Sequence, residues 1–61
     1  MFLITPITEI CKDWVKENVN LESWQWLGDS FAVEHRYAVD LVVGMMGEGL
    51  VVDKDFTVAR E

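Results

Sequence analysis

Apolar and polar positions divide the first third of the chain into a short apolar segment and a longer helical repeat. Residues 2–4 are β-prone, and they are followed by Thr5 and Pro6, residue types that are favoured at the N-cap and at the first position of a helix. The next apolar residues recur at three- and four-residue spacing, as on one face of an amphipathic helix: Ile7, Ile10, Cys11 and Trp14. The pattern predicts a strand followed by a helix over residues 6–18.

The middle of the chain carries a β-hairpin pattern. Residues 23–27 and 30–34 each alternate in character, and Gly28 and Asp29 separate them. Such a pair is typical of a two-residue turn, because Gly supplies the positive φ that the turn needs. Counted outward from the turn, the predicted pairs are Leu27 with Ser30, Trp26 with Phe31, Gln25 with Ala32 and Trp24 with Val33. This register places both tryptophans on one face of the hairpin, where cross-strand aromatic pairs stabilise it.

From His35 onward the period changes to that of a helix. The apolar stripe of this second helix consists of Tyr37, Ala38, Leu41, Val42 and Met45. Gly47 and Gly49 end the pattern, so a helix is predicted over residues 35–46. Residues 50–59 then form two short apolar runs around an acidic loop, which predicts a closing strand or a terminal hairpin.

The predicted order of elements is β-α-β-β-α-β. It favours an α+β fold in which a small, mostly antiparallel sheet carries two helices packed on one face. A chain of 61 residues buries only about 60% of its unfolded surface, so residues 1–61 are expected to form a single domain. The alternative is a winged-helix-like unit of three helices with a C-terminal β-wing, which requires residues 21–27 to be helical. The helix from His35 would then read DNA, although it offers mainly apolar side chains.

The charge of the chain favours protein partners over nucleic acids. Five Lys and Arg stand against eleven Asp and Glu, which gives a net charge of −6. Nucleic-acid-binding proteins neutralise phosphates with clustered cations. Here the cations are scattered among acids: Lys12, Lys16, Arg36, Lys54 and Arg60. Binding to DNA, RNA or an anionic membrane is therefore disfavoured, and a basic protein surface is the better electrostatic match.

The sequence is typical of a cytoplasmic protein without a stabilising cross-link. Pro6 interrupts the apolar start after a few residues, which does not fit a signal peptide, and the apolar run 37–46 is about half of the ~20 residues that a membrane span needs. Cys11 is the only cysteine, so a reducing compartment is expected. Because the domain is small, self-association would supplement its core, and a homodimer is one hypothesis.

No residue pattern points to catalysis, to a cofactor or to a metal. His35 follows Glu34, but no motif places a nucleophile beside this pair. Cys11 lies on the apolar stripe of the first helix, where a free thiol behaves as a small buried hydrophobe. We therefore expect a non-enzymatic protein with no catalytic, cofactor-binding or metal-ligating residues.

Four large side chains are candidates for contact with a partner: Trp24, Trp26, Met45 and Met46. A domain this small has little interior in which to cover three tryptophans, and Trp is enriched at the energetic centres of interfaces. The leading hypothesis is a small acidic domain that binds another protein, of the inhibitor or regulator type that bacteria and their phages carry. The alternative hypothesis is a winged-helix-like DNA-binding regulator.

Overall fold

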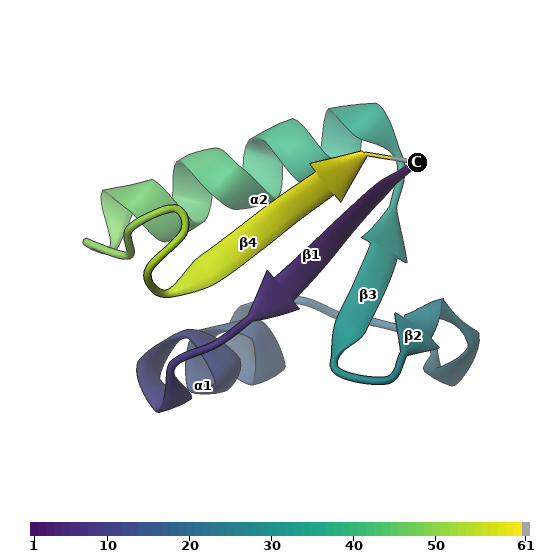
Figure 1. The fold of residues 1–61 in the computed structure, drawn as a ribbon, viewed down its shortest axis with the longest axis horizontal. Coiled ribbons are helices and arrows are strands. Elements are labelled where there is room, and N and C mark those ends of the chain that lie inside the picture. Colours follow the sequence, from purple (N-terminus) through teal and green to yellow (C-terminus); the bar gives the residue numbers. More distant parts are fainter. Residues whose placement is uncertain (61) are drawn as a thin grey trace.

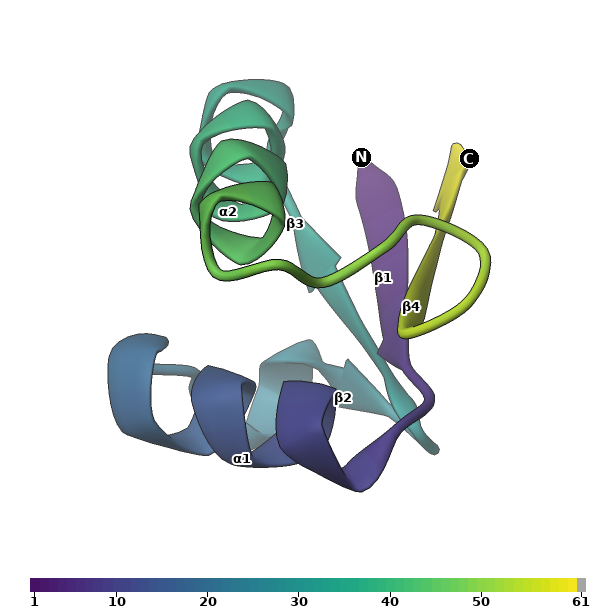
Figure 2. The same ribbon diagram turned by 90° about the vertical axis from the view of Figure 1, so that its left-hand side faces the viewer.

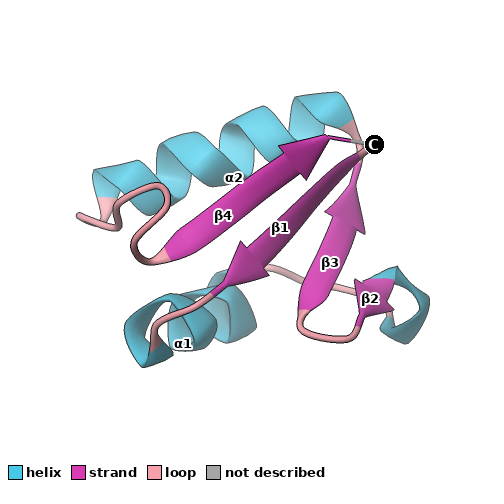
Figure 3. Ribbon diagram, in the orientation of Figure 1, coloured by secondary structure: helices cyan, strands magenta, loops and turns pink. Residues whose placement is uncertain are grey.

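The chain folds into two α-helices and a four-stranded antiparallel sheet in a computed structural model that describes residues 1–60 (Figure 1). The elements are β1 (Phe2–Pro6), α1 (Glu9–Asn18), the 3₁₀ turn η1 (Ser23–Gln25), β2 (Trp26–Leu27), β3 (Ser30–Val33), α2 (His35–Gly47) and β4 (Phe56–Arg60). Figure 3 shows how loops join them. The predicted α+β class and the predicted order of strands and helices are confirmed.

The sheet has the strand order β2-β3-β1-β4, and both helices lie on the same face of it (Figure 2). The central strand β1 pairs with β3 on one side and with β4 on the other, so strands from the two ends of the described segment lie side by side. The winged-helix alternative is wrong, because residues 21–27 contain only a three-residue 3₁₀ turn before β2.

The first helix begins later than its sequence pattern predicts. Pro6 is the last residue of β1 and lies opposite Phe56 of β4. The N-cap is Thr8, whose hydroxyl oxygen accepts the N–H of Cys11 at 3.3 Å and whose hydroxyl donates to Asp55 at 2.8 Å. Pairing with β4 therefore extends the strand through Thr5 and Pro6, and the prediction of a helix from residue 6 is wrong.

The hairpin forms at its predicted turn but is shorter than predicted. Trp26 pairs with Phe31 and Leu27 with Ser30, around Gly28 at φ +66°. Beyond these pairs the backbone leaves the sheet, and the Gln25 side-chain amide donates to the carbonyl of Ala32 at 3.2 Å. The predicted pairing of Trp24 with Val33 is wrong, because residues 23–25 form η1.

The core lies between the sheet and the two helices. Its fully buried side chains come from every layer: Ile4, Cys11, Phe31, Met45 and Phe56. The two helices meet directly, since the Cys11 sulfur lies 3.8 Å from the Met45 sulfur. They also meet where the half-buried ring of Trp14 lies against Gly44, because a Cβ at Gly44 would come within 3.3 Å of that ring.

The segment between α2 and β4 is a tight loop, so a single closing strand forms and not a terminal hairpin. The carboxylate of Asp55 holds the loop, because it accepts the N–H of Val51 at 2.8 Å and the hydroxyl of Thr8 at 2.8 Å. These two bonds, the one from Val51 first, lower the pKa of Asp55. Asp53 takes a left-handed conformation with φ 69°, and its N–H bonds to the carbonyl of Phe56. The loop thereby covers the start of the outer edge of β4.

Candidate protein-binding surfaces

The structure divides the four predicted contact residues between two surfaces and the core. Trp24 is 71% exposed and Trp26 is 38% exposed, whereas Met46 is 56% exposed and lies near the far end of α2. β2 and the C-terminal end of α2 lie on opposite sides of the molecule (Figure 1). Met45 is fully buried in the core, so it cannot contact a partner.

The first surface consists of Trp24, Trp26 and Leu27, and we call it the tryptophan surface. Trp24 lies in η1, which is fixed by two hydrogen bonds: the N–H of Gln25 donates to the Glu22 carbonyl at 3.0 Å, and the N–H of Glu22 donates to the Gln25 side-chain oxygen at 2.9 Å. Trp26 lies edge-on to the buried ring of Phe31, with ring centres 5.3 Å apart and an interplanar angle of 66°. The ring of Trp26 is therefore held against Phe31, whereas η1 fixes only the backbone at Trp24, and Trp24 and Leu27 remain largely exposed.

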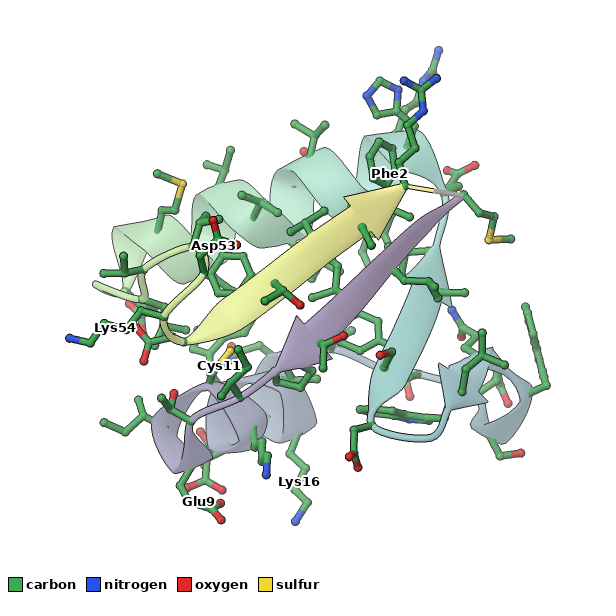
Figure 4. The ribbon with its side chains drawn as sticks, viewed as in Figure 1. Phe2, Glu9, Cys11, Lys16, Asp53 and Lys54 are labelled. Atoms are coloured by element: carbon green, nitrogen blue, oxygen red, sulfur yellow. The ribbon has the colours of Figure 1, made fainter. Side chains whose placement is uncertain are left out.

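A hollow of about 280 Å³ lies beside Trp26, between α1 and the turn that joins β2 to β3. Its ionisable lining residues are three acids, Glu9, Asp13 and Asp29, and two bases, Lys12 and Lys16. Figure 4 shows Glu9 and Lys16 pointing away from the sheet on the outer side of α1. The hollow thus combines an aromatic wall with a mixed, slightly acidic rim, which suits the entry of a partner side chain.

The second surface is the outer side of α2. It carries three apolar side chains at helical spacing, each about half exposed or more: Val39, Val43 and Met46. A shallow hollow of about 220 Å³ lies beside them, lined by Phe2, His35, Ala38, Val39, Val42, Val43 and Val58. Sequence analysis missed Val39 and Val43, although their i, i+4 spacing, continued by Met46, was a second apolar stripe on the same helix. We call these three residues the α2 stripe.

Cys11 and His35, the two residues weighed above for catalysis, both pack against other side chains of the domain. Cys11 is fully buried, and burial first and the charge of Asp55 second raise the pKa of its thiol, so it stays protonated at neutral pH. His35 packs against the ring of Phe2, with ring centres 5.3 Å apart. Figure 4 shows Phe2 beside the first turn of α2 and Cys11 between α1 and the sheet. Within residues 1–60, no three His, Cys, Asp or Glu side chains are grouped so that they could hold a metal ion.

Comparisons with protein-family models, with curated proteins and with solved structures gave no match to this chain. Neither of the described helices is both long and apolar enough to cross a membrane.

Proposed function

We propose that the protein is a small, acidic, non-enzymatic domain that binds another protein through the tryptophan surface. The observation that carries this proposal is the 71% exposure of Trp24 in a segment whose backbone is held by the hydrogen bonds between Glu22 and Gln25. Indole side chains dominate the energy of many interfaces, because they bury a large rigid area at a small cost in conformational entropy. Because the backbone at Trp24 is already ordered, its exposed indole can be buried by a partner without a further cost in backbone entropy.

The charge of the domain defines the partner that suits it. With a net charge of −6 and a mixed, slightly acidic rim around the hollow beside Trp26, the domain is suited to a basic protein surface. A nucleic-acid-binding protein offers such a surface, and an inhibitor of the type found in bacteria and phages could cover it with carboxylates. Binding that weakens steeply with salt supports a contact made by the acidic rim, whereas binding insensitive to salt supports one made by the indoles.

The test compares three immobilised proteins in affinity capture from the native cell lysate: the wild type, Trp24→Ala and Ile10→Ala. Ile10 on α1 is 72% exposed and is therefore a matched control for the loss of an exposed apolar side chain. After identification by mass spectrometry, titration calorimetry measures the affinity of the captured protein. We expect the wild type and Ile10→Ala to bind equally, and Trp24→Ala to bind at least ~30-fold more weakly, as for a hot spot of about 2 kcal/mol.

Equal binding by all three proteins would exclude the tryptophan surface as the contact site. Recovery of no specific partner would contradict the proposal as a whole.

A further inference from the structure

The outer edge of β4 carries backbone groups that the sheet leaves unpaired. β4 is the last strand in the order β2-β3-β1-β4, so only one of its sides is paired with another strand. Pro6, which has no N–H, lies opposite Phe56, and the Phe56 carbonyl accepts the N–H of Asp53 in the loop. Because backbone groups alternate in direction along a strand, those of Val58 and Arg60 also point outward, away from β1.

The loop between α2 and β4 covers only the start of this edge. Val52 of the loop makes a parallel bridge with Phe56, and Figure 2 shows the loop beside the first part of β4. Among residues 1–60, no backbone group bonds to Val58 or Arg60 on the outer side. The edge therefore offers the N–H and the carbonyl of each of these residues to one more extended segment.

An apolar hollow lies beside the same edge. The walls of this hollow of about 220 Å³ include four valines, two of them from the α2 stripe: Val39, Val42, Val43 and Val58. Side chains directly opposite one another on antiparallel strands lie on the same face of the sheet. On an added strand, a side chain opposite Val58 therefore faces the hollow, which suits an apolar residue.

The next open position on the edge is cationic. Arg60 is exposed and lies opposite Phe2, and both line a second hollow, of about 180 Å³, together with His35. The acidic N-cap residue Glu34 follows Val33 of β3, from which Arg60 is separated by β1. Two strand spacings amount to about 10 Å, so Glu34 does not take the position beside Arg60 on the open edge. An acidic side chain on an added strand is the complement of that position.

We propose that the outer edge of β4 binds an extended segment of another protein as a fifth, antiparallel strand, which carries an apolar residue opposite Val58 and an acidic residue opposite Arg60. The antiparallel direction is that of every strand pair in the sheet. A second copy of β4 fits less well, because its open positions place Val58 opposite Arg60 of the partner subunit and bring the two arginines into diagonal contact on one face. The inference does not rest on the proposed function, because β4 and β2, which carries the tryptophan surface, are opposite edges of the sheet.

Titration of the isotope-labelled protein with a short peptide, followed by NMR, tests the inference. The probe is the acetylated and amidated peptide Ser-Glu-Thr-Ile-Thr, in which Glu lies opposite Arg60 when Ile lies opposite Val58, and which ends before the loop at Phe56. We expect the backbone amide signals of Val58 and Arg60 to shift on binding and that of Leu27, on the opposite edge, to stay in place. With so few hydrogen bonds, the expected dissociation constant is on the order of 1 mM.

Two N-methylated peptides separate strand pairing from unspecific contact. In the proposed register the N–H of the peptide Ile points to β4, whereas the N–H of the Thr before it points to solvent. Methylation of the Ile nitrogen should weaken binding at least ~10-fold, because it removes one hydrogen bond and blocks the approach of the strand. Methylation of the Thr nitrogen is the matched control and should leave the affinity unchanged.

A charge exchange tests the position of the acidic residue. A peptide with Lys in place of Glu should bind the wild type more weakly, and Arg60→Glu, at an exposed site, should bind the Lys peptide better than the Glu peptide. The inference would be overturned by unshifted amides of Val58 and Arg60 at about 10 mM peptide, by equal losses from both N-methylations, or by a charge preference that Arg60→Glu leaves unchanged. Shifts of these amides that grow with protein concentration alone would assign the edge to a second copy and overturn the proposed partner.

Discussion

Two glycines of α2 provide a controlled test of how the helices are packed. Gly44 lies against Trp14 of α1, so that an added Cβ would come within 3.3 Å of Cζ2 and 3.4 Å of Cη2 of the indole. An added Cβ at Gly47 would meet nothing within 4 Å. Gly44→Ala and Gly47→Ala therefore make the same chemical change in the same helix, one at a packed position and one in open space.

The two substitutions should change the free energy of unfolding differently: Gly47→Ala should raise it, and Gly44→Ala should leave it unchanged or lower it. Gly to Ala within a helix stabilises by up to about 1 kcal/mol, and somewhat less at the helix end where Gly47 lies. At Gly44 this gain is opposed by overpacking, which costs about 1–3 kcal/mol when the neighbour cannot move freely. We expect Gly47→Ala to raise the free energy of unfolding by about 0.5 kcal/mol and Gly44→Ala to lie at least about 1 kcal/mol below it.

Urea denaturation followed by circular dichroism measures this difference, and thermal melting should show it as a gap of about 4–8 °C in Tm per kcal/mol for a domain of this size. Trp14→Leu in the Gly44→Ala background is the control, because removing the indole should remove the overpacking at residue 44 and leave only the helix-propensity gain of Ala. If Gly44→Ala stabilises as much as Gly47→Ala, Trp14 does not hold α2 at this point, and the helix contact described above is wrong.

Three further predictions concern the turn, the loop and the thiol. Gly28→Ala forces a side chain into a positive φ and should lower the free energy of unfolding by about 1 kcal/mol, measured by urea denaturation. The lowered pKa of Asp55 means that its contribution to stability is complete above the ordinary Asp value of about 4 and is lost as the pH falls further. Asp55→Asn should accordingly be less stable than the wild type at pH 7, with a gap in urea midpoint that closes in acid; a constant gap would contradict this. Burial and the raised pKa of Cys11 should make its reaction with a thiol reagent at pH 7 far slower in the native protein than in urea, and equal rates would show that the helix interface is open.

The sequence pattern predicted correctly those turns and helix ends that depend on residues close together in the chain. Gly28 fixed the hairpin turn and the register of Trp26 with Phe31, and the change of period at His35 located the start of α2. The phase of α2 was harder to predict. Met45 and Met46 are adjacent in sequence and about 100° apart on the helix, so one is in the core and the other is in solvent.

The start of α1 depends on contacts between residues far apart in the chain, which the local sequence pattern does not contain. Thr5 and Thr8 are both acceptable N-caps, and the choice fell to Thr8 because β4 pairs with Thr5 and because Asp55 bonds to Thr8. Trp24 is not paired in the sheet, because residues 23–25 form η1 and Gln25 bonds to the Ala32 carbonyl with its side chain and not its backbone. Period-2 alternation does not reveal this bond, so the residues of the tryptophan surface were recognisable as candidates but their arrangement was not.

The position of β1 at the centre of the sheet has a consequence for how the protein is made in the cell. Its partner β4 emerges from the ribosome after the other described elements, and the Thr8–Asp55 bond spans 47 positions of the chain. During translation β1 therefore stays unpaired on one side until residues 56–60 have emerged. We expect the sheet to form only after that point, so nascent chains stopped before Phe56 should remain sensitive to protease.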